Sequence, residues 1–147
     1  ITPQGHKRFM TGGRVRGCYY GLGQASSVWV VCEGVATAHS IHEATNLTLA
    51  AAFSASNLMP VAQTLKQKNP KCTIIIAADD DHLTEGNPGL TAARAAAMAV
   101  GGLVVMPQFP ANRPGKATDF NDLSALAGTG VVHECFAEVM KGLSHEL

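Results

Sequence analysis

The chain has 147 residues, of which 46% are hydrophobic and only 5% are aromatic. This length and composition indicate one domain with a substantial core and exclude a chain that is disordered throughout. The formal net charge is zero, so the chain as a whole is not a basic nucleic-acid-binding protein. The four cysteines have no CxxC spacing, and no apolar run is long enough to span a bilayer. We therefore expect a reduced, cytoplasmic protein without a zinc site and without membrane contact.

The first 24 residues are rich in glycine and basic side chains, and they predict an N-terminal arm ahead of one domain at residues 25–147. A short hairpin is expected between Arg14 and Tyr20. Such an arm favours contact with a phosphate polymer, and a solvated basic terminus is the alternative. Because the chain begins at Ile1 rather than Met, we expect it to be a fragment of a longer protein. The basic residues that precede Glu33, the first acidic residue, are Lys7, Arg8, Arg14 and Arg16.

Apolar runs alternate with helical patterns from residue 28 onwards. Val28–Cys32 is a continuous apolar run, which is typical of a strand that is buried on both faces. This alternation predicts an α/β fold with a Rossmann-like central parallel sheet of about four strands and helices on both faces. The other expected strands are 48–53, 72–78 and 103–106. The first expected helix is 34–45, the second begins at Ser56 or Asn57 and ends at about Lys68, and the third follows the 86–89 turn and ends at about Val100. Two further helices are expected at 119–127 and 131–143.

Acidic residues follow three of the four expected strands. In an open α/β sheet the carboxyl ends of parallel strands meet at one edge, where ligands bind. Carboxylates crowded together repel one another, and a bound cation removes that penalty. Oxygen ligands favour Mg²⁺ or Mn²⁺ over softer metals. The sequence therefore predicts a divalent-metal site at this edge, built from Glu33, Asp79, Asp81, Asp119 and Asp122.

The spacing of the acidic residues supports this prediction. In an extended segment residues i and i+2 point to the same side, so Asp79 and Asp81 share a side and Asp80 points away, to solvent or to a helix N-terminus. The alternative is a polar turn that caps the following helix, for which one aspartate would suffice, and no lysine or arginine lies close along the chain. Glu33 directly follows five apolar residues, where an unpartnered carboxylate is costly. Its alternative role is to complement the dipole of the helix that follows.

Three motifs resemble the Toprim domain, the catalytic domain of bacterial-type primases, of type IA and type II topoisomerases and of some nucleases. They are VWVVCEGVATAHSI, IIIAADDDHLTEGNPGLTAARAA and ATDFNDL, and together they span roughly residues 27–127. The likeness is greatest to the Toprim domain of plasmid- and phage-type DNA primases or primase-helicases. The segment HKRFMTGGRVRGCYYGLG also resembles the short basic segment that precedes this domain in such primases.

The resemblance implies a role for each acidic residue. Glu33 matches the family glutamate that acts in acid/base chemistry or in metal binding, and Asp79 and Asp81 match the DxD metal ligands. Asp119 and Asp122 resemble the later acidic pair of the primase branch, with one extra residue between them. One position departs from the family pattern: Thr37 stands where many bacterial primases carry a second acid, so one metal ligand of the fuller set is missing.

The function implied by the resemblance is Mg²⁺-dependent (or Mn²⁺-dependent) nucleotidyl transfer by a DNA primase that synthesises RNA primers. The implied partners are a single-stranded DNA template, nucleoside triphosphates and a helicase domain in the same or another chain. The basic residues at positions 7, 8, 14 and 16 are expected to contact nucleic acid or phosphate. The same contact is expected of His82, which adjoins the aspartates, and the alternative is that His82 is a loop residue without a role in binding.

Three other functions stay open from the sequence. A Toprim-type nuclease, or another Toprim enzyme that cleaves and rejoins DNA, would use the same carboxylates. A non-catalytic α/β module would only bind nucleotide or metal. A receiver-like signalling domain is disfavoured, because it needs an acidic pair after the first strand and a lysine after the last, where Met106 and Pro107 stand.

Overall fold

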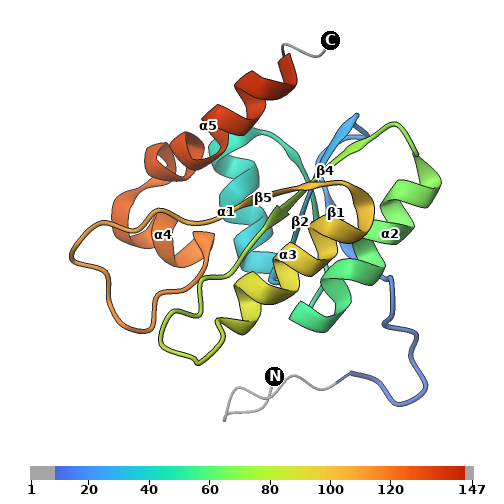
Figure 1. Cartoon of the computed structure of the whole chain (residues 1–147), viewed down its shortest axis with the longest axis horizontal. Coiled ribbons are helices and arrows are strands. Elements are labelled where there is room, and N and C mark those ends of the chain that lie inside the picture. The colour runs from blue at the N-terminus through green and yellow to red at the C-terminus, as the bar shows by residue number, and fades with distance from the viewer. Residues whose placement is uncertain (1–8, 145–147) are drawn as a thin grey trace.

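The computed structural model describes residues 9–144 as a five-stranded sheet with helices on both faces (Figure 1). The predicted α/β class and the Rossmann-like sheet are confirmed, with five strands where about four were expected. No helix in the described residues is long and apolar enough to cross a membrane. The strands are β1 (Tyr20–Leu22), β2 (Val28–Cys32), β3 (Thr48–Ala51), β4 (Thr73–Ala77) and β5 (Leu103–Val105), and the helices are α1 (Val35–Thr45), the 3₁₀ helix η1 (Ala55–Asn57), α2 (Leu58–Lys68), α3 (Pro88–Val100), α4 (Phe120–Ala127) and α5 (Thr129–Ser144).

The strand order across the sheet is β1-β3-β2-β4-β5, and the last four of these strands run parallel to their neighbours. Strand β1 pairs antiparallel with β3 and puts Tyr20 opposite Ala51. The hairpin expected between Arg14 and Tyr20 is therefore wrong, because that segment contains a turn and the chain then pairs with β3 instead of with itself. This pairing covers the backbone groups of β3 that would otherwise form an open sheet edge.

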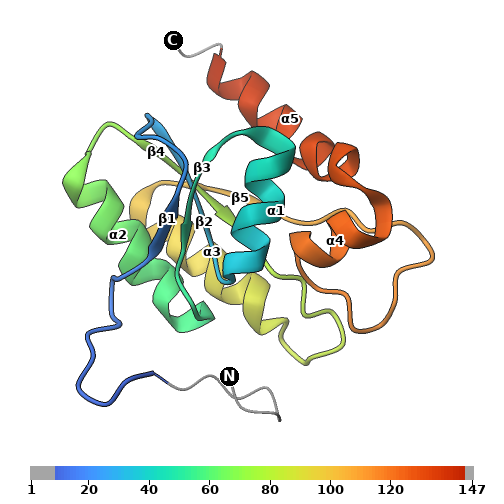
Figure 2. The same ribbon diagram turned by 180° about the vertical axis from the view of Figure 1, so that it is seen from behind.

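The two faces of the sheet carry different helices. Helices α2 and α3 cover one face, and α1, α4 and α5 cover the other (Figure 2). Successive side chains of β4 point to opposite faces of the sheet and so contribute to both cores. Ile74 and Ile76 belong to the core beneath α2 and α3, whereas Ile75 belongs to the opposite core. Small side chains such as Ala93 and Ala96, both fully buried, let α3 lie close to the sheet.

Of three residues predicted to end or cap a helix, two do so in the structure and one does not. Asn46 ends α1 and Gly101 ends α3, both in the left-handed conformation, with φ of 57° and 62°. Asn57 directly precedes α2 as expected, but its side chain does not bond to that helix. It binds the N-terminal segment instead, as described below.

The connections place a switch point between β2 and β4. Helix α1 leads from β2 to β3 on one face, and α2 returns from β3 to β4 on the opposite face, so the strand order reverses between these two neighbours. A crevice opens at such a point at the carboxyl ends of the strands, which is where ligands bind in open α/β sheets. Glu33 directly follows β2 and Asp79 lies two residues after β4, so these residues flank the crevice.

Candidate functional site

Three of the predicted carboxylates influence one buried thiol electrostatically. The side chain of Cys32, the last residue of β2, is fully buried. Burial raises the pKa of this thiol far above its ordinary value, and the negative charges of Asp79, Asp119 and Glu33 raise it further. These three carboxylates come from three separate loops, and a hydrogen bond from Thr37 ties Asp119 to the first turn of α1, which begins two residues after Glu33. The structure thus brings together residues that the sequence separates by up to 86 positions.

Glu33 and Asp79 are both half-buried at the switch point. The backbone carbonyl of Glu33 accepts a hydrogen bond of 2.8 Å from the amide of Phe53, which follows β3. Asp79 has interaction partners of its own, while its Oδ1 atom is buried and receives no hydrogen bond from a described residue. Both acids are therefore set at the sheet edge by the strands that precede them.

Asp119 and Asp122 begin helix α4 with a reciprocal cap. The amide of Asp122 donates to Asp119 Oδ1 (2.8 Å), and Asp122 Oδ2 accepts from the amides of Thr118 (2.8 Å) and Asp119 (3.4 Å). Asp119 Oδ2 accepts from the hydroxyl of Thr37 at 2.9 Å. Thr37, which stands in place of the expected second acid, is almost completely buried and orients Asp119. Asp122 faces the start of its own helix, which is a structural role.

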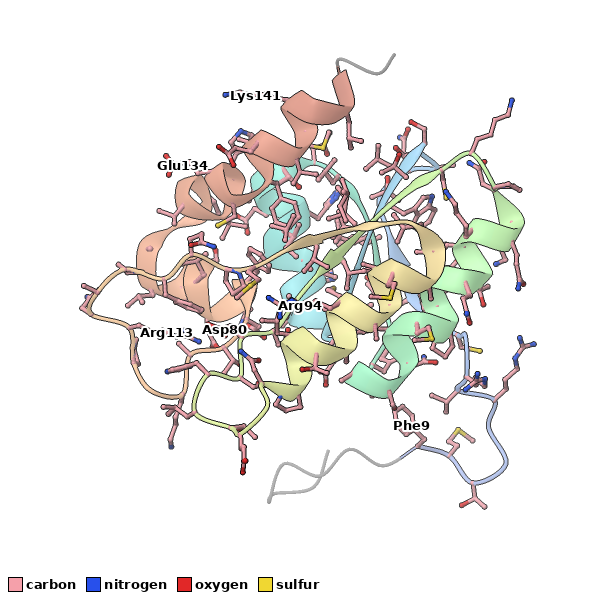
Figure 3. The ribbon with its side chains drawn as sticks, viewed as in Figure 1. Phe9, Asp80, Arg94, Arg113, Glu134 and Lys141 are labelled. Carbon is pink, nitrogen blue, oxygen red and sulfur yellow. The ribbon has the colours of Figure 1, made fainter. Side chains whose placement is uncertain are left out.

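Asp80 is held by Arg113, which comes 33 residues later in the chain (Figure 3). Arg113 Nη1 lies 2.6 Å from Asp80 Oδ2, Nη2 donates to the Asp80 carbonyl, and both Nε and Nη2 donate to the carbonyl of Ala117. The guanidinium also stacks over the ring of Phe109 at 4.1 Å. Burial alone would raise the pKa of Asp80, but hydrogen bonds from Arg113 and Asn87 and the charge of Arg113 hold that pKa below its ordinary value.

This pairing corrects two expectations. Asp80 does not face solvent, although its Oδ1 does contact Asn87, the residue that precedes α3, and a cation does lie beside the three aspartates. A backbone amide of the same helix N-terminus binds Asp81, whose Oδ2 accepts from the amide of Gly89 at 2.8 Å. No spacing in the sequence links Asp80 to Arg113, because the ion pair forms only when the β5–α4 loop folds back over the β4–α3 loop.

Asn87 and Gly89 fix the acidic loop against α3. The side chain of Asn87 accepts from the amide of Asp81 (2.9 Å) and donates to Asp80 Oδ1 (2.6 Å), and it also caps the helix at Leu90. A Cβ atom at Gly89 would lie 2.8 Å from both the Asp79 carbonyl and Asp81 Oδ2, so only glycine permits this approach. Asn87 and Asp81 therefore share the cap of α3, since Asn87 accepts from the amide of Leu90 and Asp81 accepts from the amide of Gly89.

The donor set suits a hard cation, although it is not a closed cage. Within residues 9–144 no group of three His, Cys, Asp or Glu side chains is arranged so as to hold a metal ion by itself. Mg²⁺ is commonly held by only one or two carboxylates, with waters and substrate phosphates as its other ligands. Glu33 and Asp79 at the switch point offer only oxygen atoms, and the buried Oδ1 of Asp79 receives no hydrogen bond from a described residue, which fits that mode of binding.

The predicted basic residues fall in different places. Arg14 and Arg16 are exposed on a turn that precedes β1 and line a pocket with α2. Lys7 and Arg8 lie outside the described residues. His82 is exposed in the acidic loop, where its amide donates to the Asp80 carbonyl at 2.8 Å.

Comparison with known proteins identifies the family. A family model described as "Toprim domain" matches residues 28–130, from the start of β2 to the first turn of α5. The chain belongs to the Toprim family. This confirms the resemblance seen in the sequence, and it places the acidic edge described above inside the Toprim match while Arg14 and Arg16 lie outside it.

Two relatives share substantial identity with this Toprim domain. A protein named DNA primase TraC from Escherichia coli is 41% identical over 118 residues, which cover 74% of this chain and 11% of the relative. A second protein of the same name and organism is 39% identical over 135 residues, covering 86% of this chain and 9% of the relative. The chain thus spans about a tenth of the length of these relatives. No solved structure matches the chain.

Proposed function

We propose that this Toprim domain carries out divalent-metal-dependent nucleotidyl transfer in a DNA primase, joining nucleoside triphosphates into an RNA primer on single-stranded DNA. The observation that carries the proposal is the placement of Glu33 and Asp79 after the two strands that flank the switch point, with Asp119 hydrogen-bonded to Thr37 at the start of α1. The family and the two relatives named DNA primase support the same reading.

In this proposal Mg²⁺ or Mn²⁺ would be held by Asp79 and Asp81, with Asp119 and Glu33 close by, and Asp122 keeps its role in the helix cap. When bound, the metal neutralises the triphosphate and stabilises the entering and leaving oxygens. The chain contributes the rigidity of the ligands: Arg113 draws Asp80 aside, and the amide of Gly89 fixes Asp81.

Glu33 is proposed to accept the proton of an attacking 3′-hydroxyl. A general base must sit within reach of the reacting group and be held in place. The position of Glu33 directly after β2, with its carbonyl tied to Phe53, supports this role. A single-stranded template is proposed because the relatives are named DNA primase, and a helicase partner is proposed from the sequence resemblance to primase-helicases alone.

The test is primer synthesis on single-stranded DNA by the native protein and by its Glu33→Gln variant, which keeps the shape of the side chain and removes its basicity. The proposal requires Mg²⁺-dependent synthesis by the native protein and its loss in the variant. Undiminished synthesis by Glu33→Gln would remove the acid/base role. Cleavage of DNA without synthesis would favour the nuclease alternative instead.

A further inference from the structure

The turn that carries Arg14 and Arg16 is built into the domain. The amide of Cys18 donates to the carbonyl of Val15 at 2.9 Å, and Gly17 has φ of +74°, so the chain reverses tightly at this point. Arg16 stands at the corner of that turn. A Cβ atom at Gly17 would lie 2.8 Å from Thr64 Oγ1, which shows how closely the turn packs against α2.

Asn57 holds this turn in place. Its side chain is only 4% exposed, accepts from the amide of Gly17 at 2.9 Å and donates to the carbonyls of Val15 (3.2 Å) and Cys18 (3.0 Å). The same NH2 group, which has only two hydrogens to share among its acceptors, also donates to the carbonyl of Ala52, directly after β3, at 2.9 Å. A buried polar side chain thus uses its hydrogen bonds to fasten the arginine turn to the carboxyl edge of the sheet.

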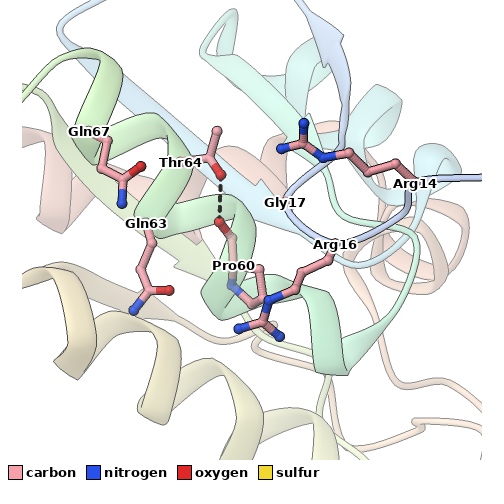
Figure 4. Close-up of a pocket in the computed structure, with 7 residues that line it drawn as sticks. All are labelled: Arg14, Arg16, Gly17, Pro60, Gln63, Thr64 and Gln67. Carbon is pink, nitrogen blue, oxygen red and sulfur yellow. Dashed lines mark hydrogen bonds between the residues drawn. The ribbon is translucent and has the colours of Figure 1, made fainter.

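A polar pocket lies between the turn and α2 (Figure 4). It has a volume of about 290 Å³ and is lined by Arg14 and Arg16 from the turn and by Gln63, Thr64 and Gln67 from the helix. Gln63 and Gln67 are four residues apart and so share one helix face. No carboxylate lines the pocket, and neither arginine forms an ion pair with another described residue. The charge of the turn is therefore available to an anion.

A second pocket, which is aromatic, shares Arg14 with the first. Its volume is about 200 Å³, and Phe9, Val15, Cys18 and Phe53 line it together with Arg14. Phe9, labelled in Figure 3, is half exposed although its side chain is large and apolar. The backbone of Phe53 has φ of 70°, an unusual conformation for a bulky residue. Its amide donates to the Glu33 carbonyl, so this pocket borders the acidic edge.

We propose that these two pockets form a binding track for single-stranded DNA that leads to Glu33. One base stacks against Phe9 and Phe53, the adjoining phosphate binds Arg14 and Arg16, and the next nucleotide reaches the amides of Gln63 and Gln67. Proteins that bind single strands commonly combine a positive groove with aromatic stacking in this way. The inference rests on the proposed function only in taking the bound strand to be the template for primer synthesis. Recognition of phosphates and bases at the two pockets does not itself require catalysis.

The charge of the pockets favours a phosphodiester over a nucleoside triphosphate. A triphosphate normally binds with a divalent cation, and that cation needs oxygen ligands such as carboxylates. Among the residues that the structure describes, no Asp or Glu lines either pocket. A phosphodiester carries a single negative charge without a metal, which matches the guanidinium groups of Arg14 and Arg16.

The test is the binding of a fluorescently labelled oligothymidylate to the chain at several salt concentrations, followed by anisotropy. Arg14→Ala is expected to weaken binding about tenfold and to make the salt dependence shallower, by roughly 0.7 in the logarithmic slope. Phe9→Ala should weaken binding between about fivefold and a hundredfold, with an unchanged salt slope. Phe9→Tyr should restore most of the affinity.

An oligomer of the same length without bases separates the two pockets. It keeps every phosphate, so Arg14→Ala should still weaken its binding, whereas Phe9→Ala should have no effect on it. Gln63→Ala should weaken binding of the ordinary oligonucleotide without changing the salt slope. Lys71→Ala and Gln24→Ala are the matched controls, because both residues are exposed in loops that precede strands, at the opposite edge of the sheet.

Three results would overturn the inference. The first is a wild-type chain that does not bind the oligonucleotide even at low salt. The second is an Arg14→Ala or Phe9→Ala variant that binds like Lys71→Ala. The third is complete competition by a nucleoside triphosphate at concentrations at which a second oligonucleotide does not compete. If primer synthesis fails while oligonucleotide binding is unchanged, the result counts against the proposed function and leaves this inference standing. The double variant Asp79→Asn/Asp81→Asn should show normal oligonucleotide binding.

Discussion

Arg113 and Asp80, which are 33 residues apart in the sequence, form an ion pair with 2.6 Å between Arg113 Nη1 and Asp80 Oδ2. Only 16% and 14% of the two side chains are exposed. The same guanidinium donates to the carbonyls of Asp80 and Ala117, so it joins the loop after β4 to the segment that leads into α4. One arginine therefore fixes the relative positions of Asp79 and Asp119, the carboxylates on either side of this bridge.

The first prediction concerns the contribution of this ion pair to stability. Arg113→Ala should lower the free energy of unfolding in urea by about 3 kcal/mol, because it leaves a largely buried carboxylate without its partner. Arg113→Lys should recover only part of this loss, since an ammonium group cannot reach both carbonyls and the carboxylate. The control is Arg94→Ala, which removes an exposed arginine of α3. Equal stabilities of Arg113→Ala and Arg94→Ala would contradict the prediction.

The second prediction concerns pH. Asp80 has a pKa below its ordinary value of 3.8 in the folded chain, so it binds protons less readily there than in the unfolded chain. Its stabilising contribution is complete above 3.8 and is lost as the pH falls through the lower folded value. The stability difference between wild type and Arg113→Ala, measured by urea unfolding, should therefore shrink at pH values below 3.8. A difference that stays constant into that range would show that Asp80 is not the titrating group.

The third prediction concerns Thr37. Thr37→Val keeps the volume of this buried side chain and removes the hydroxyl that donates to Asp119 Oδ2. The free energy of unfolding should fall by about 1–3 kcal/mol, because a polar atom of Asp119 loses its donor. Thr37→Ser, which keeps the hydroxyl, should lose less than Thr37→Val. The reverse order of the two variants would mean that the methyl group, rather than the hydrogen bond, matters at this position.

The fourth prediction concerns Gly89. Alanine usually favours a helix over glycine, but a Cβ atom here would press on Asp81 Oδ2 and on the Asp79 carbonyl. Gly89→Ala should therefore destabilise the chain by about 1–3 kcal/mol. Gly130→Ala in α5 is the matched control, because no atom lies within 4 Å of a Cβ atom built there. The expectation fails if thermal unfolding shows that both variants have the same or higher stability than wild type.

The sequence predicts most of the fold because its strongest signals are local. The apolar run of β2 predicts a buried strand, and Asn46 and Gly101 end their helices as expected. Strand β1 was missed because three residues that include a glycine carry no strand pattern, and the strand exists only through its pairing with β3. Its neighbour, the arginine turn, likewise depends on Asn57, about 40 residues away in sequence.

In the candidate site, too, some features follow from the sequence pattern and others depend on contacts between distant residues. The carboxyl ends of parallel strands meet at one sheet edge, so the shared position of Glu33 and Asp79 follows from strand order. Asp119, in contrast, caps α4 beyond the long loop after β5. The interactions that hold each carboxylate are not local: Arg113 binds Asp80, and Thr37 binds Asp119 across 82 residues. Residue types and spacing cannot reveal such pairs, because they arise only when separate loops fold against one another.

The central claim is that the carboxylates at the switch point bind a divalent cation together with a nucleotide. The most direct measurement is a calorimetric titration of Mn²⁺ or Mg²⁺ into the chain, with and without a nucleoside triphosphate, for wild type, Asp79→Asn/Asp81→Asn and Glu134→Gln, an exposed residue of α5. We predict saturable metal binding that the triphosphate strengthens, that the double variant loses and that Glu134→Gln keeps. Equal metal binding by the double variant and wild type, or none by wild type with the triphosphate present, would contradict the claim.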